Sequence, residues 1–121
     1  MKRKGFPSPD QTNTEPTPAL DPFDTALLEA EISADDAVPT LDLHGLNREE
    51  ARFALQAALN SALQSGHDCL KIIHGNGDIL RKEVHKFLQE QQTLHLVAKF
   101  RPSTVNNQMA GVTVAALYRL K

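Results

Sequence analysis

Apolar and polar residues from position 40 onward follow two alternating periods, which predict strands and helices in turn. Residues 40–44 alternate with period 2, as a strand does. Residues 51–63 repeat apolar side chains at i, i+3 and i+4, which is typical of a helix with one buried face. The same two periods predict, in order, a strand at 69–73, a helix from about Asp78, a strand at 94–100 and a strand at 112–120.

Local signals mark where the first of these helices starts and stops. Asn47 is followed three residues later by Glu50, a pair that caps a helix start by reciprocal hydrogen bonds. Gly66 can end the helix in a left-handed conformation. Strand–helix–strand connections this short join parallel strands. We therefore predict an α/β fold, a two-layer βαβαββ sandwich. A mixed four-stranded sheet packs on two helices, and the last strand is antiparallel to the other three.

The first third of the chain differs from this domain in composition. Residues 1–40 carry 3 basic and 8 acidic side chains and 6 of the 7 prolines, and the first 20 residues show neither period. Such a composition is typical of a segment that cannot bury a core. We predict an acidic, Pro-rich leader at 1–37, mostly disordered, and a folded domain at 38–121. Residues 21–37 are expected to form at most a short exposed helix, and a chain starting near Val38 is expected to keep its stability.

Composition excludes several classes of protein. Cys69 is the single cysteine, so neither a disulfide within the chain nor a zinc site made of cysteines can form. No apolar run reaches the roughly 18 residues of a membrane-spanning helix, and the first residues lack the apolar stretch of a secretory signal. These features predict a cytoplasmic protein. The net charge is −2 overall but +3 over residues 41–121, from 10 basic and 7 acidic side chains, so the domain itself is mildly basic.

Polar and glycine-rich segments follow each of the predicted parallel strands. Open α/β sheets bind ligands beyond the carboxyl ends of their strands. The segments expected at that edge are Asp42–Gly45 after the first strand, His74–Gly77 after the second, Arg101 after the third and Gly111 before the fourth. Their convergence predicts a functional rim at one edge of the sheet.

Asp42 and His44 lie two residues apart and so point to the same face of a strand. A carboxylate beside an imidazole orients the ring and favours its charged form, which suits general acid–base chemistry or phosphate contact. Alternatively, Asp42 accepts hydrogen bonds from loop amides and His44 is a surface residue. The His74–Gly77 turn can hold an anion against the N–H groups of a helix start, or it is a plain turn that needs glycine.

The remaining candidate residues carry less information. Arg101 has the planar fork that grips phosphate, and Arg81, near the start of the second helix, can add charge to a basic rim. A solvated surface explains both arginines equally. Three further histidines, His67, His85 and His95, lack the spacing of metal ligands and are interpreted as surface residues.

The motifs in this order resemble those of one known family. Leu-Asp-Leu-His-Gly-Leu at 41–46, Ile-Ile-His-Gly-Asn-Gly at 72–77 and Gly-Val-Thr-Val at 111–114 are similar to the motifs of the small MutS-related (Smr) domain. The resemblance covers residues 40–120 and implies a stand-alone Smr protein with the α/β fold described above.

Many Smr domains are endonucleases that nick DNA or cut RNA, and others bind nucleic acid, some of them at ribosomes. The resemblance therefore implies a hydrolase acting on phosphodiester bonds, with DNA or RNA, and in some cases the ribosome, as partners and no membrane. It assigns catalysis to Asp42, His44 and His74. It assigns nucleic-acid binding to Gly45, Gly75, Asn76, Gly77, Arg81, Arg101 and Gly111.

The sequence departs from the family pattern in three ways, one of which is a segment between Gly77 and Leu80 that is one residue short. The variable position of His-Gly-x-Gly, often Lys, is Asn76, and of a usual Gly-Gly-x-Gly element only Gly111 remains. A non-catalytic nucleic-acid-binding module is therefore the alternative function, and an adaptor that docks through the acidic leader is a third. No metal ligands are predicted. RNA can be cleaved through its own 2′-hydroxyl, whereas cleavage of DNA favours a divalent ion such as Mg²⁺.

Overall fold

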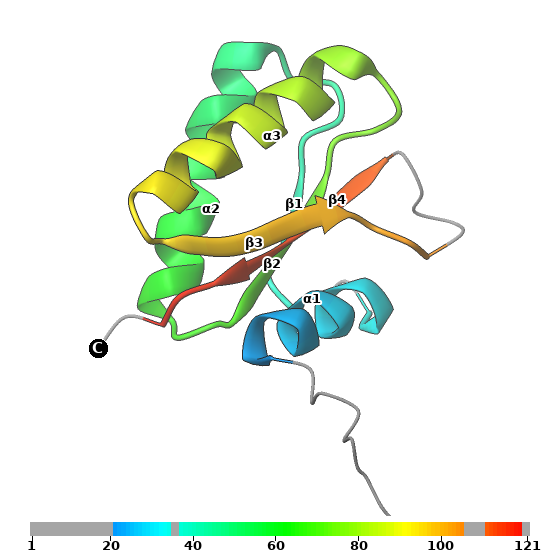
Figure 1. Cartoon of the computed structure of the whole chain (residues 1–121). Coiled ribbons are helices and arrows are strands. Elements are labelled where there is room, and N and C mark those ends of the chain that lie inside the picture. The colour runs from blue at the N-terminus through cyan, green and yellow to red at the C-terminus, as the bar shows by residue number, and fades with distance from the viewer. Residues whose placement is uncertain (1–20, 35–36, 106–110, 120–121) are drawn as a thin grey trace, which may run out of the picture.

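The computed structural model describes residues 21–34, 37–105 and 111–119 (Figure 1). These residues form three helices and four strands. In chain order they are α1 (Pro22–Ile32), β1 (Thr40–Asp42), α2 (Arg48–Gln64), β2 (Cys69–Ile73), α3 (Asp78–Thr93), β3 (Val97–Pro102) and β4 (Val112–Leu117). None of the helices in the described part of the chain is long and apolar enough to cross a membrane.

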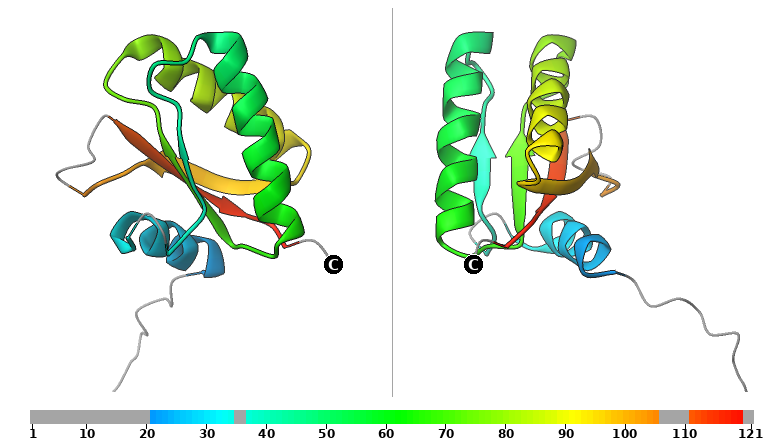
Figure 2. Two further views of the ribbon diagram at one scale, coloured as in Figure 1. Left: turned by 180° about the vertical axis from the view of Figure 1, so that it is seen from behind. Right: turned by 60° about the vertical axis from the view of Figure 1, so that its left-hand side comes forward.

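The four strands form one mixed sheet with the spatial order β1-β2-β4-β3. Strands β1 and β2 are parallel, whereas β4 runs antiparallel to both of its neighbours, β2 and β3. Helices α2 and α3 cover one face of this sheet, and α1 crosses the other (Figure 2). The predicted α/β class, the element order from residue 40 and the mixed four-stranded sheet are confirmed, and α1 adds a third helix.

Helices α2 and α3 pack on the sheet through the apolar stripes that the sequence shows. Leu55 and Leu59 of α2 and Phe87 and Leu88 of α3 are fully buried in the larger core. Helix α2 begins with the expected capping box. The Asn47 side chain accepts from the Glu50 N–H (2.8 Å), and the Glu50 carboxylate accepts from the Asn47 N–H (3.0 Å).

Four predicted strand ends differ from the structure, and one of them is the end of β3, which continues to Pro102 instead of stopping at Phe100. Strand β1 ends at Asp42, so that His44 lies in the following turn. Strand β3 begins at Val97 because α3 continues to Thr93 and the chain turns at His95, whose φ of 62° does not suit a strand. The alternation predicted from 94 onward therefore begins too early, and Leu94 is exposed. Strand β4 ends at Leu117 rather than at residue 120, which lies outside the described residues.

Helix α1 packs on the sheet, which differs from the exposed helix expected within residues 21–37. Ala26, Leu27 and Ala30 are buried in a second core. The sheet residues of that core are Cys69, Val112, Val114 and Ala116. Apart from Lys71 and Thr113, strands β2 and β4 are apolar on both faces, and the face away from α2 and α3 needs a cover that only α1 supplies in the described part of the chain. The rest of the predicted leader, residues 1–20, lies outside the described residues.

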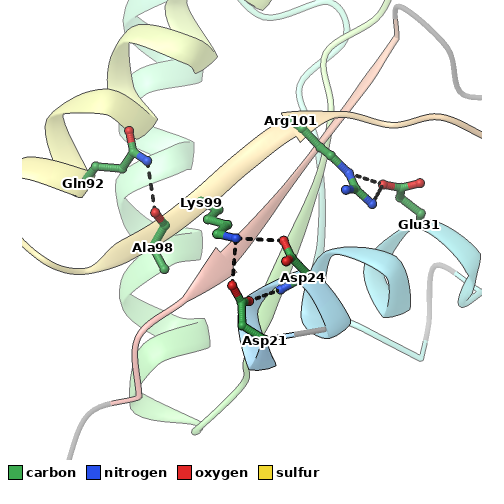
Figure 3. Close-up of polar contacts among 7 residues, drawn as sticks. All are labelled: Asp21, Asp24, Glu31, Gln92, Ala98, Lys99 and Arg101. Atoms are coloured by element: carbon green, nitrogen blue, oxygen red, sulfur yellow. Dashed lines mark hydrogen bonds and ion pairs between the residues drawn. The ribbon is translucent and has the colours of Figure 1, made fainter. Parts of the chain in front are cut away.

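Charged groups fix α1 on this face of the sheet (Figure 3). Lys99 of β3 contacts the carboxylates of Asp21 and Asp24, each at 2.9 Å. Arg101, also on β3, donates to the Glu31 carboxylate at 2.7 Å through Nε and contacts it at 2.6 Å through a terminal nitrogen. The Glu31 side chain is 1% exposed. Helix α1 is thus held by both apolar packing and ion pairs.

Candidate functional site

The ends of β1 and β2 and the start of β4 meet at one edge of the sheet. The Leu43 N–H donates to the Ile73 carbonyl (2.7 Å), which extends the β1–β2 pairing beyond Asp42. The N–H groups of His74 and Gly75 both donate to the Gly111 carbonyl, at 2.9 and 3.1 Å. The segments 42–45, 74–77 and Gly111 therefore form one rim, as the sequence predicts.

Asp42 and His44 form a directly bonded pair on this rim. The Asp42 Oδ1 atom lies 2.6 Å from His44 Nδ1, and it also accepts the backbone N–H of His44 at 3.0 Å. Both side chains are open to solvent, His44 with 76% and Asp42 with 48% of its surface exposed. The backbone hydrogen bond holds the turn, and the side-chain hydrogen bond orients the imidazole ring. The two alternatives that the sequence leaves for Asp42, anchoring the loop and orienting His44, are therefore both met by its Oδ1 atom.

This contact favours the charged form of His44 and determines the tautomer of its neutral form. Its hydrogen bond to Asp42 raises the pKa of the His44 imidazole, and the same bond, with that from the His44 N–H, lowers the pKa of the Asp42 carboxyl. The carboxylate accepts from Nδ1–H, so Nε2 carries the lone pair when the ring is neutral. The Nε2 atom is the one that can exchange a proton with a bound molecule.

His74 lies behind the rim rather than on it. The residue is 3% exposed. Its Nδ1 atom contacts the Gly75 carbonyl at 2.8 Å and its Nε2 atom contacts the Thr113 hydroxyl at 2.9 Å. Because both ring nitrogens are occupied, His74 shapes the Gly75 turn and does not present a free proton donor or acceptor to solvent.

Two turns of the rim require glycine, and a third glycine lies in a close approach. Gly45 and Gly75 have φ angles of +85° and +79°, which side chains with a Cβ rarely adopt. A Cβ on Gly111 would lie 3.1 Å from Asn76 Oδ1, a tight contact that would require the Asn76 side chain to shift by a few tenths of an ångström. Gly77 precedes α3 and provides no side-chain cap for its first N–H groups.

The two candidate arginines have different positions. Arg81 lies on the first turns of α3, where it pairs with Asp78. Arg101 is on β3, separated from β2 by β4, and its guanidinium binds Glu31 of α1 on the opposite face from α3. The structure therefore does not bring Arg101 to the rim. The sequence places Arg101 after the third strand and at the rim, but it lies within β3, and the Glu31 carboxylate that binds it belongs to the segment predicted as a leader.

Comparison with known families matches the Smr domain to residues 41–118. The chain belongs to the Smr family. Similar proteins include the endonuclease MutS2 of Staphylococcus carnosus, which is 40% identical over 78 residues, and that of Helicobacter pylori, which is 38% identical over 78 residues. Each match covers 64% of this chain and 10% of the relative, so the chain matches about a tenth of the length of these proteins.

Solved structures agree with this assignment. The Smr domain of Thermus thermophilus MutS2 has a TM-score of 0.62 at 32% identity, over 67% of this chain and 99% of that domain. YdaL, a stand-alone small MutS-related protein from Escherichia coli, has a TM-score of 0.68 at 20% identity, over 88% of this chain and 82% of that one. The second comparison shows a shared fold. The resemblance read from the motifs is confirmed.

His85 of this Smr domain is half-buried, whereas the sequence predicts it on the surface. Its Nε2 atom contacts the Thr113 hydroxyl at 3.1 Å, and Thr113 in turn contacts His74. A consistent proton arrangement has His85 Nε2–H donating to Thr113, and Thr113 O–H donating to His74. The signal in the sequence is Thr113, a polar residue at an inward position of the apolar strand β4.

Stability should depend on pH through this pair of histidines. Burial lowers the pKa of both His74 and His85. The unfolded chain then takes up protons at a higher pH than the folded chain, so stability falls as the pH drops below about 6.5. We expect a lower free energy of unfolding, measured in urea, at about pH 5.5 than at about pH 7.5.

A histidine variant isolates this effect from that of His44, whose raised pKa acts in the opposite direction. His85→Gln should flatten the pH dependence, since it removes one buried group that resists protonation. His67→Gln is the matched control, because it makes the same replacement at an exposed histidine that does not contact Thr113. An equal pH dependence in wild type and His85→Gln would contradict the prediction.

Proposed function

We propose that this Smr-family protein is an endonuclease that cleaves the nucleic-acid backbone at the Asp42–His44 pair. The observation that carries the proposal is the 2.6 Å contact between two exposed side chains on the rim, which leaves His44 Nε2 directed away from its carboxylate partner. A carboxylate-oriented imidazole with an accessible second nitrogen is a common arrangement for proton transfer in hydrolysis.

In this proposal His44 moves the protons and Asp42 holds it in place. Cleavage of a phosphodiester requires a proton to leave the attacking oxygen and a proton to reach the departing oxygen. Neutral His44 accepts the proton of the attacking oxygen through Nε2. The resulting imidazolium, stabilised by Asp42, then donates this proton to the departing oxygen. In RNA the attacking oxygen is the 2′-hydroxyl beside the scissile bond, so the side chains at the rim suffice.

The phosphate is proposed to sit against the glycine turns. Gly75, Asn76 and Gly77 lead into the first turn of α3, whose N–H groups receive no side-chain cap. Such a helix start favours a negative group. Gly45 lies in the neighbouring turn, and Arg81 supplies positive charge beside Asp78. His74 and Gly111 are proposed to position this turn, and Arg101 is left out because Glu31 occupies it.

A resident metal ion does not fit the donor groups of the rim. Within residues 21–34, 37–105 and 111–119 no three His, Cys, Asp or Glu side chains come together as ligands. The rim offers one carboxylate and one imidazole, which already bond to each other. The proposed chemistry therefore uses the side chains alone, and nucleic acid is the only partner proposed.

The relatives support hydrolysis in general terms. The matched region lies in proteins named endonuclease MutS2, and the chain matches about a tenth of their length. That name describes those proteins and does not specify the substrate of this chain. The choice between RNA and DNA rests on the donor set of the rim, which favours RNA.

A cleavage assay tests the proposal. Labelled single-stranded RNA, duplex DNA and supercoiled plasmid are each incubated with the protein in Mg²⁺ and in EDTA. We expect RNA cleavage that persists in EDTA. Cleavage of DNA only, and only with Mg²⁺, would contradict the side-chain mechanism. If none of the substrates is cleaved, the proposed endonuclease function is contradicted.

The second candidate, a module that binds nucleic acid without cutting it, has one observation in its favour. His74 is enclosed and bonded at both ring nitrogens, so the rim exposes one histidine rather than two. Binding in a gel-shift measurement without cleavage in the assay above identifies this function.

A further inference from the structure

A groove between α2 and α3 holds every lysine and arginine of the described residues that has no partner. The described residues include nine lysines and arginines in all, and six of these bond to acidic side chains or to a carbonyl. These six are Arg52, Lys71, Arg81, Lys99, Arg101 and Arg119. The other three, Arg48, Lys82 and Lys86, make no hydrogen bond or ion pair with described residues, and all three line the same groove.

The remaining lining of this groove does not neutralise the three cations. Glu83 also lines it, but its carboxylate is bound by Arg52 at 2.7 Å. Arg52 additionally pairs with Glu90, so the acidic groups between the two helices already have a partner. The fifth lining residue, Ile79, is 67% exposed. The groove thus combines uncompensated positive charge with an apolar side chain.

The groove adjoins the rim. Arg48 is the first residue of α2 and follows the turn that contains His44 and Gly45. Ile79 is the second residue of α3 and follows the Gly75–Gly77 turn. Both helices begin at the end of the molecule where β1 and β2 finish (Figure 2). Lys82 and Lys86 lie farther along α3, one turn apart, or about 6 Å along the helix axis.

We propose that this groove binds the phosphodiester backbone of a nucleic-acid strand that extends from the rim. Lys82 and Lys86 contact successive phosphates, Arg48 holds the strand where it leaves the rim, and Ile79 packs against a sugar or base. With the groove, the binding site extends over several phosphates, whereas the rim alone contacts one. The inference rests on the proposed function, because it extends the strand bound there.

Binding of a short fluorescein-labelled single-stranded RNA by the full chain tests the groove. Fluorescence anisotropy is measured from about 50 to 200 mM salt. The variants are Lys82→Gln, Lys86→Gln and the double variant. Arg119→Gln is the matched control, since it also removes one exposed positive charge but lies after β4. Thermal unfolding of each variant checks that the fold is kept.

We expect each lysine variant to weaken binding, and the double variant to weaken it about fivefold or more and to reduce the salt slope by about 1.4. Arg119→Gln should bind as the wild type does. Wild-type affinity and slope in the double variant would overturn the groove while leaving cleavage at the rim intact. A wild-type protein that binds no nucleic acid would instead overturn the proposed function.

A competition experiment distinguishes a nucleic-acid strand from an acidic protein as the ligand of the groove. Unlabelled RNA and polyglutamate are compared as competitors at equal charge concentration. We expect RNA to displace the probe at a much lower concentration, because the strand engages both the groove and the rim. Equal displacement by polyglutamate would show that the groove reads negative charge alone and would overturn the assignment to a nucleic-acid strand.

Discussion

Replacing His44 by alanine is expected to reduce cleavage about 100-fold or more, with little change in binding or stability. The side chain is 76% exposed and bonds only to Asp42, so its loss opens no cavity in the core. The phosphate contacts proposed at the Gly75–Gly77 turn should remain. The measurement is the initial rate of RNA cleavage, with affinity and melting temperature determined on the same samples.

Asp42→Asn should lower the rate in the same way, and the double variant should be little worse than either single variant. Residues that act as one unit are strongly non-additive. Asp42 raises the pKa of His44, so the residual activity of Asp42→Asn should rise at a lower pH than that of the wild type. A merely structural Asp42 would not shift the pH profile.

His67→Ala serves as the control for these variants, because it removes an exposed histidine that precedes β2, away from the rim. A normal cleavage rate in His44→Ala, together with unfolding of Asp42→Asn, would show that Asp42 only anchors the turn. The endonuclease assignment at this pair would then be abandoned in favour of binding without cleavage.

Removing residues 1–37 is expected to destabilise the protein strongly. The truncation uncovers the second core, in which Leu27 is 2% and Ala30 0% exposed. It also frees Lys99 and Arg101 from their carboxylate partners. Lost apolar burial, partly offset by the entropy regained by the helix, gives a net loss on the order of 2–4 kcal/mol. We expect the melting temperature to fall by about 10 °C or more.

A chain that starts at Asp21 is the matched control. It keeps every described contact of α1 and should melt within a few degrees of the full chain. Leu27→Ala in the full chain tests the same packing without a truncation, and it should cost about 2–3 kcal/mol, since a buried leucine loses its contacts. An unchanged melting temperature in the chain starting at Val38 would show that α1 is dispensable.

The elements that follow residue 40 were predictable because their signals are local. The repeat of apolar residues every 3.6 positions is visible within the sequence of the helix itself, and the Asn47–Glu50 capping box involves residues only three positions apart. The rim was predictable for a related reason, since parallel strands place their carboxyl ends at one edge whatever their side chains are. Asp42 and His44 are predicted as a pair on one face of a strand, whereas in the structure they make contact across the turn that follows β1.

The parts that were missed depend on partners distant in sequence. Helix α1 has an apolar stripe too short to reveal what it covers, and its partners lie on β2 and β4. Arg101 is 70 residues from Glu31, and His85 is 28 residues from the Thr113 hydroxyl that it contacts. No pattern within either neighbourhood identifies these contacts. The sequence therefore predicts Arg101 at the rim and His85 on the surface, whereas Arg101 binds the buried Glu31 carboxylate and His85 is half-buried.

The ion pairs of α1 also make the distribution of positive charge over the molecule uneven. They cancel the lysine and arginine of β3, so the described face that carries α1 presents no unpaired lysine or arginine, whereas the α2–α3 face keeps its own. Such a separation of charge is a dipole, and a dipole turns in the field of a polyanion before contact is made. A nucleic acid that diffuses toward the protein should therefore arrive mostly at the helical side. We expect the association rate, more than the dissociation rate, to fall as salt screens this field.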